Sequence, residues 1–199
     1  VGSMPELPEV EVVARGLRVS VLGHTVLDDL AQADPQVPQA RLAVANLAHA
    51  ADQHDRAALE AGKALALRPD DEGIVVATAR FVQASSAGTA GAIRVLQAYL
   101  SRFPKALEAR FQYARLLASD GRTADARREM ELALREDPDS PAILFSLAQL
   151  AYQNKQSAAA ADYLKRYIGL SDSVPPALVA GHRAWRQHAA RLLRRRWPE

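Results

Sequence analysis

Four prolines recur at nearly constant spacing, and this spacing constrains the fold more than any other feature of the sequence. Pro35, Pro69, Pro104 and Pro138 are separated by 34, 35 and 34 residues. The last three each follow an apolar run of helical character. Proline ends such a run because it lacks an amide hydrogen and its ring clashes with the preceding turn. A period of this length is typical of stacked helical hairpins, so the sequence predicts repeated helix pairs.

Small residues recur in the same register as the prolines. With each terminal proline numbered as position 32 of its copy, position 20 is alanine in every copy and position 8 is alanine in three; these residues are Ala57, Ala92, Ala126 and Ala160, then Ala45, Ala114 and Ala148. A helical hairpin cannot bury its apolar face alone, so neighbouring hairpins must stack, and small residues let them approach closely. In the second copy position 8 is Arg80, which predicts loose packing of that copy.

Period, alanine register and terminal proline together resemble the tetratricopeptide repeat family over residues 35–172. The resemblance implies an all-α fold, a right-handed solenoid of four antiparallel helix pairs, with copies at about 38–70, 71–104, 105–138 and 139–172. We expect the first helix of each copy at about 38–51, 72–85, 106–119 and 140–153, and the second at about 55–67, 89–102, 122–135 and 157–169. The large aromatic that this family carries at position 4 is replaced by Arg41, Val76, Arg110 and Leu144.

The same resemblance implies a concave groove, lined by positions 2, 5, 9 and 12 of the first helices, that binds a peptide or protein partner. From these positions we select eight candidate groove residues: Asn46, His49, Phe81, Phe111, Arg115, Phe145, Gln149 and Tyr152. At position 9, Asn46, Arg115 and Gln149 would bond to an extended peptide or a carboxylate, while the phenyl rings receive apolar side chains. The alternative is that these rings belong to the ordinary core.

The stretch MPELPEVE, residues 4–11, resembles the N-terminus of formamidopyrimidine-DNA glycosylases, and the similarity continues to about Val26. In that family a free N-terminal proline amine attacks the sugar of a damaged nucleoside and the next glutamate moves protons, which places these roles on Pro5 and Glu6. Here Pro5 is acylated by Met4. An acylated nitrogen has no lone pair available for a Schiff base, so we expect no glycosylase activity.

Other parts of a glycosylase are also missing from the sequence. The family uses a catalytic lysine on a strand, a helix–two-turn–helix unit and a four-cysteine zinc finger, but the chain has no cysteine. Its lysines all fall within the helical repeat; they are Lys63, Lys105, Lys155 and Lys165. We find no phosphate-binding glycine loop and no nucleophile elbow, and we predict no cofactor.

Histidines and aspartates cluster near one predicted turn, at His49, Asp52, His54 and Asp55. Such residues suggest a metal ion, but they straddle a turn and no supporting residues can be identified around them. We favour a solvated turn and predict no metal site.

The two ends of the chain are predicted to flank the repeats. Residues 1–3 resemble the remnant of a cleaved expression tag. Residues 4–34 form a glycosylase-like leader, for which two interpretations stay open. One is an N-terminal cap that packs a helix through Val10, Val13, Leu17 and Val21, and the other is a disordered segment.

Residues 173–199 predict a basic helix, from about Ala177 to Arg196, that caps the last copy. Residues 173–199 carry Trp185 and Trp197 and the arginines Arg183, Arg186, Arg191, Arg194, Arg195 and Arg196. Arginine with aromatic side chains is also typical of contacts with nucleic acid. An alternative function is therefore a DNA-associated protein that uses the leader and this arginine-rich helix.

Composition limits the remaining classes. The formal net charge of +2 is too small to indicate a nucleic-acid footprint by itself, and no apolar run approaches the roughly 18 residues that span a bilayer. Cytoplasm and periplasm both stay open, because the absence of cysteine leaves the redox compartment undetermined. We predict a non-enzymatic scaffold for protein–protein interaction, with dimerisation through repeat faces as a further option.

Overall fold

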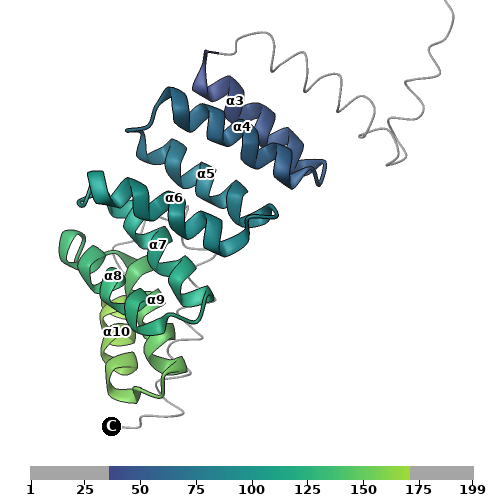
Figure 1. The fold of residues 1–199 in the computed structure, drawn as a ribbon. Helices are drawn as coiled ribbons and strands as arrows, with labels where there is room; N and C mark the ends of the chain where they lie inside the picture. Colours follow the sequence, from purple (N-terminus) through teal and green to yellow (C-terminus); the bar gives the residue numbers. More distant parts are fainter. Residues whose placement is uncertain (1–35, 171–199) are drawn as a thin grey trace, which may run out of the picture. The chain divides into compact units, whose positions relative to one another are not determined.

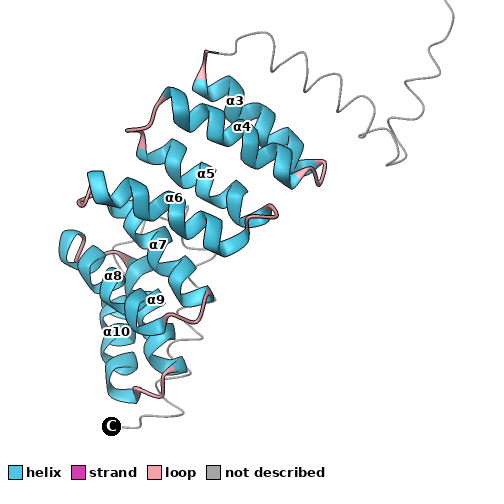
Figure 2. Cartoon of the chain, viewed as in Figure 1, coloured by secondary structure: helices cyan, strands magenta, loops and turns pink. Residues whose placement is uncertain are grey.

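A computed structural model describes residues 36–170, and all regular structure in this range is helical (Figures 1 and 2). The first helices of the four copies are α3 (Pro38–Ala50), α5 (Glu72–Ala84), α7 (Leu107–Ser119) and α9 (Pro141–Gln153). The second helices are α4 (His54–Leu67), α6 (Gly88–Arg102), α8 (Thr123–Glu136) and α10 (Ser157–Leu170). Every expected helix is present with each end within one residue of its predicted position. The predicted all-α fold of sequential antiparallel helix pairs is confirmed.

Several predicted segments lie outside the described residues. These are the tag remnant at 1–3, the leader at 4–34 and the C-terminal capping helix within 173–199. The right-handed sense of the solenoid stays a prediction. None of the helices between residues 36 and 170 is long and apolar enough to cross a membrane.

Three of the four turns within a copy end the first helix in the same way. Each turn has one residue with left-handed backbone, and these are Asp52 (φ 57°), Gly121 (φ 80°) and Lys155 (φ 59°). The amide of the next residue donates to a carbonyl five residues earlier, as in Gln53 N to Ala48 O at 2.9 Å. This bond satisfies a carbonyl that the helix end would leave without a partner.

The second copy uses a different turn. Between α5 and α6 the left-handed residue is Gly88 (φ 57°), four residues after the last residue of α5 rather than two. Ser86 N donates to the Asp55 carboxylate at 2.8 Å, so the first turn of α4 holds this connection. The bond lowers the pKa of Asp55. The extra residue of the 35-residue spacing therefore lies in this turn.

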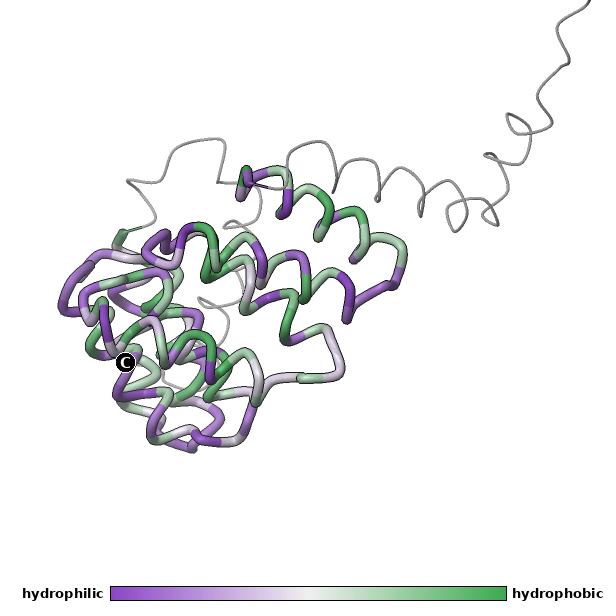
Figure 3. The backbone as a smooth tube through the Cα atoms, turned by 45° about the horizontal axis from the view of Figure 1, so that its top comes forward, coloured by the Kyte–Doolittle hydropathy of each residue, from purple (hydrophilic) through white to green (hydrophobic). Residues whose placement is uncertain are grey.

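The described chain divides near residue 99 into two compact units, each with its own core. In the first unit α3 packs on α4 and both pack on α5. Its core cluster comprises Val44, Ala45, Ala48, Ala57, Ala61 and Phe81. In the second unit α7 packs on α8, α8 on α9 and α9 on α10, with a cluster of Leu144, Ala148, Leu164 and Tyr167. Figure 3 shows polar and apolar stretches alternating along the helices, as stacking of amphipathic helices requires.

The alanine register explains how the helices approach one another. All four position-20 alanines, Ala57, Ala92, Ala126 and Ala160, are fully buried. In the first helices the eighth residue counted from the helix start is alanine in every copy, namely Ala45, Ala79, Ala114 and Ala148, and each is at most 3% exposed. A methyl group at these points leaves room for the neighbouring backbone.

The second copy corrects our predicted register. Ala79, not Arg80, occupies the place of Ala45, and Arg80 is exposed. Positions were counted back from the terminal proline, and the extra residue lies between α5 and that proline. Every position assigned to α5 was therefore displaced by one residue. The reason for expecting loose packing of that copy, an arginine at the small-residue place, is therefore wrong.

Copies one and three replace the position-4 aromatic with an ion pair between their two helices. Arg41 Nη1 lies 2.9 Å from Glu60 Oε2, and Arg110 Nη1 pairs with Glu129 in the same way. In both copies the glutamate follows the arginine by 19 residues. In copies two and four, the equivalent places hold apolar or aromatic residues, Val75 with Val95 and Leu144 with Tyr163. Polar and apolar copies therefore alternate.

Candidate functional site

The ninth residue of each first helix is polar and exposed. Counted from the helix starts, these residues are Asn46, Arg80, Arg115 and Gln149. We define them as the position-9 row. Three of them are predicted groove residues, but the sequence register missed Arg80. The 35-residue spacing showed that one residue was extra in this copy, but its place after α5 is visible only in the structure.

Phe81 was predicted to line the groove, and the structure contradicts this prediction. Its side chain is 1% exposed and packs among Val44, Ala48 and Ala61 in the core of the first unit. It is the tenth residue of α5, and the tenth residues of α7 and α9, Leu116 and Leu150, are buried as well. For this ring the alternative interpretation, ordinary core, is correct.

In the first unit the row consists of Asn46 and Arg80. Arg80 Nη2 donates to Asn46 Oδ1 at 3.5 Å, and the guanidinium carbon lies 5.1 Å from the centre of the Phe81 ring. His49, one turn along α3 from Asn46, is exposed, and its ring centre lies 5.7 Å from that of Phe81. This surface presents a guanidinium, an amide and an imidazole above an aromatic core residue.

In the second unit Arg115 and Gln149 border a hollow of about 230 Å³. It is lined by Arg115, Ala118, Ser119, Met130, Ser146, Gln149, Leu150 and Gln153. Met130 and Leu150 are each 3% exposed, so they supply an apolar floor. Arg115 is the one charged side chain among the lining residues.

Hydrogen bonds orient the polar groups of this hollow. Arg115 Nη1 donates to Gln112 Oε1 at 3.0 Å, and Gln112 Nε2 donates to Glu108 Oε1 at 2.7 Å along the exposed side of α7. The Ser119 and Ser146 hydroxyls each donate to a carbonyl of their own helix at 2.8 Å. A guanidinium, amides and hydroxyl oxygens therefore surround an apolar floor, a combination suited to a peptide segment.

The remaining predicted groove residues differ in exposure. Phe111 and Phe145 are half-buried, and Phe145 packs against the second core cluster with its ring centre 5.7 Å from that of Tyr167. Tyr152 is exposed at 41%. Phe145 therefore contributes to the edge of the core, whereas Tyr152 offers an aromatic face to solvent.

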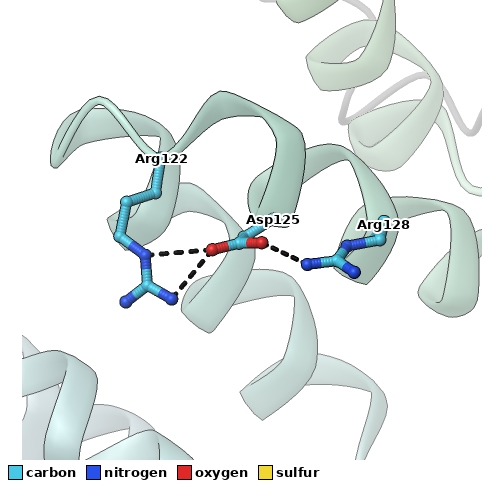
Figure 4. A network of polar contacts seen from close by, with 3 residues as sticks. All are labelled: Arg122, Asp125 and Arg128. Carbon is cyan, nitrogen blue, oxygen red and sulfur yellow. Dashed lines mark hydrogen bonds and ion pairs between the residues drawn. The ribbon is translucent and has the colours of Figure 1, made fainter.

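A cluster of three charged side chains lies elsewhere, at the start of α8 (Figure 4). Asp125 accepts from Arg122 Nη2 at 2.8 Å and from Arg128 on its other oxygen. Hydrogen bonds from these two arginines lower the pKa of Asp125. Its charges are paired within one exposed helix end, which is the arrangement of a structural network rather than of a poised acid or base.

The candidate metal residues do not converge in the described part of the chain. His49 Nδ1 and His54 Nδ1 lie 3.1 Å apart, but Asp55 is engaged by Ser86, and Asp52 Oδ1 is 3.9 Å from the opposite nitrogen of His54. Between residues 36 and 170 no group of three or more potential ligands could hold a metal ion.

Two family models match the sequence. The model of the tetratricopeptide repeat matches residues 119–175, and that of the formamidopyrimidine-DNA glycosylase N-terminal domain matches residues 4–129. No curated protein sequence matches the chain significantly.

Several solved structures have the same fold. The crystal structure of MamA is 13% identical, with a TM-score of 0.63, and the match covers 85% of this chain and 98% of MamA. PilW, a "widely conserved type IV pilus biogenesis factor", is 19% identical with a TM-score of 0.62, covering 96% of this chain and 90% of PilW. YrrB, "a TPR protein with an unusual peptide-binding site", is 15% identical with a TM-score of 0.57, covering 89% and 98%.

By its repeats and fold the chain is a tetratricopeptide repeat protein. By sequence, residues 4–129, more than half of the chain, also match the family of formamidopyrimidine-DNA glycosylase N-terminal domains. The two assignments disagree over residues 36–129. There the structure has helix pairs with buried alanines at the crossings, and it contains no strand to carry a catalytic lysine. The glycosylase match is therefore not supported by the fold of these residues.

Proposed function

We propose that this protein is a non-enzymatic scaffold that binds an extended segment of a partner protein along its first helices. The observation that carries the proposal is the position-9 row, polar and exposed in every copy directly after a buried alanine. Within each unit two of these side chains lie together, Arg80 beside Asn46 and Arg115 with Gln149, so they can bond to neighbouring groups of an extended peptide.

Chemistry in the second unit supports a peptide ligand. Arg115 can bond to a carboxylate or to backbone carbonyls, and the Gln149 amide can both donate and accept. The apolar floor of Met130 and Leu150 would receive a side chain of the same segment. YrrB, a protein of the same fold, has an unusual peptide-binding site, which supports this class of ligand.

Partner capture tests the proposal with three forms of the full chain. Wild type, Arg115→Glu and Arg94→Glu would each be used as bait for cell lysate, with circular dichroism as a check of folding. Arg94 is exposed on α6 and lies outside the row, so its substitution matches the charge change. We expect Arg115→Glu alone to lose the captured proteins. Equal capture by all three forms would refute the proposal.

A DNA-associated function is the second candidate, favoured by the glycosylase match at 4–129 and by the six arginines between Arg183 and Arg196. A mobility shift of duplex DNA at rising salt separates it from the scaffold function, because phosphate contacts weaken steeply as salt displaces them. A shift at low salt that disappears with salt supports DNA association. No shift at low salt removes this candidate.

A further inference from the structure

The tenth residue of each first helix is a large apolar residue, and one of the four is exposed. Phe81, Leu116 and Leu150 are 1%, 7% and 3% exposed, whereas Leu47 on α3 is 44% exposed. All four copies have a large apolar side chain at this position, so the side chain itself does not explain the difference in exposure. The difference must therefore come from what surrounds the position in the first copy.

Phe81 shows what normally covers this position. Its ring lies in one core cluster with Ala57 and Ala61 of α4, the second helix of the copy that precedes it in the chain. The tenth residue of a first helix is thus a contact to the preceding helix pair. Leu47 belongs to the first described copy, so no described helix pair precedes it. In a stacked array such a terminal face needs a cap.

A second exposed leucine provides a contrast. Leu59 on α4 is 59% exposed, and its counterparts on α6, α8 and α10 are Arg94, Arg128 and Asp162, all exposed. Leu59 therefore lies at a position that faces solvent in every copy. Leu47 differs because its counterparts are core residues, which marks its face as a stacking surface.

We propose that residues 4–34 of this chain cover the face of α3 around Leu47, in the manner of a preceding second helix. Only residues 35–37 separate this segment from the start of α3. Its stretch VEVVARGLRVSVL carries Val10, Val13, Leu17 and Val21 at helical spacings of three and four. Covalent attachment raises the effective concentration of this stripe at Leu47 above that of any second molecule.

The sequence lacks cysteine, so disulfide trapping in the full chain can test this contact. Two pairs are compared at low protein concentration under mild oxidation: Leu17→Cys with Leu47→Cys, and Arg15→Cys with Leu47→Cys as the control. Arg15 lies off the apolar stripe by helical spacing. We expect an intramolecular disulfide in the Leu17 pair, formed about tenfold faster than in the control because a packed contact holds the thiols within bonding distance.

Three outcomes would overturn the proposal. Equal rates for the two pairs indicate random collisions of an unattached segment. A disulfide-linked dimer formed by the Leu47→Cys variant alone assigns the face to a second copy of the chain. No disulfide with either pair leaves Leu47 uncovered.

A stability comparison covers the case in which cysteine disturbs the contact. Leu47→Ala is expected to lower the urea midpoint of the full chain, whereas Leu59→Ala leaves it unchanged, because only the first removes a packed side chain. Equal midpoints for the two variants would contradict a covered Leu47.

Discussion

At the scale of single residues, Arg80 and Phe81 are adjacent on α5 but have opposite surroundings. Phe81→Ala is expected to lower the free energy of unfolding by about 3–5 kcal/mol, because it leaves a cavity among Val44, Ala48 and Ala61. Arg80→Ala removes an exposed side chain and should change it by less than about 0.5 kcal/mol. Urea denaturation followed by circular dichroism measures both. A large loss for Arg80→Ala with none for Phe81→Ala would restore the register in which Phe81 faces the groove.

Glu60 is a second residue whose surroundings decide its contribution. The side chain is 6% exposed, with Lys63 Nζ at 2.6 Å and Arg41 Nη1 at 2.9 Å. Burial raises the pKa of Glu60, but hydrogen bonds from Lys63 and Arg41 outweigh burial, and the pKa is lowered. Because the folded state binds the proton more weakly than the unfolded state, the stabilisation is complete above the unfolded pKa and is lost as pH falls through the folded pKa.

The expected test is Glu60→Gln, measured by urea denaturation over a pH series. At pH 7 the substitution should lower the free energy of unfolding by about 2 kcal/mol, since it removes charged hydrogen bonds to Arg41 and Lys63. The difference from wild type should shrink as pH falls below about 4.3, the usual pKa of glutamate in an unfolded chain. Glu136→Gln, at an exposed position on α8, is the control. A difference that grows toward acid pH would contradict the assignment.

At the scale of helices, two glycines have opposite roles. Gly62 lies within α4, and a Cβ there would meet nothing within 4 Å. Gly91 lies in α6, and a Cβ there would stand 2.7 Å from Ala87 Cβ and 2.9 Å from Val82 Cγ1 of α5. Close approach of α6 to α5 therefore depends on glycine at position 91.

Alanine substitution separates these roles. Gly62→Ala is expected to raise the free energy of unfolding by roughly 0.5–1 kcal/mol, because alanine loses less backbone freedom than glycine in a helix. Gly91→Ala should lower it by about 1–3 kcal/mol through overpacking. Thermal or urea unfolding of the two variants gives the comparison. Stabilisation by both would show that α5 and α6 have room at their crossing.

At the scale of the whole molecule, two compact units each combine a polar and an apolar copy. The ion pairs Arg41–Glu60 and Arg110–Glu129 belong to the first copy of each unit, and Val75 and Leu144 hold the same place in the second copies. The pattern therefore repeats with the units. Each unit also has its own core cluster, so local stability is expected to differ between them.

Hydrogen exchange tests this expectation. Phe81→Ala removes core contacts of the first unit and should accelerate amide exchange in α3, α4 and α5. Exchange in α9 and α10, whose core contains Leu144 and Tyr167, should keep its wild-type rate. Mass spectrometry of peptic fragments resolves the helices. Equal acceleration in all of them would mean that the described chain opens as one cooperative unit.

The sequence by itself determined the period, the helix ends and the buried alanines of the second helices. Proline ends helices locally, and a spacing of 34 or 35 residues can be counted without knowing which residues touch. The sequence placed Asn46, Arg115 and Gln149 correctly at the ninth position of their helices. Their copies have no extra residue between the first helix and position 32, from which the other positions were counted. Phe145 and Tyr152 share that register, but their different exposure depends on neighbouring helices.

Only the tertiary structure decided where the extra residue of the second copy lies. A spacing of 35 residues is the same whether that residue precedes or follows α5, yet the choice exchanges Arg80 and Phe81 between surface and core. The burial of Ala79, and that of Phe81 in one cluster with Ala57 and Ala61 of α4, settle it, because a one-residue rotation of α5 by about 100° would place a guanidinium in the apolar core. The ion pairs of Glu60 and Glu129 also depend on the tertiary structure, because partners 19 residues apart meet only when the two helices of a copy pack together.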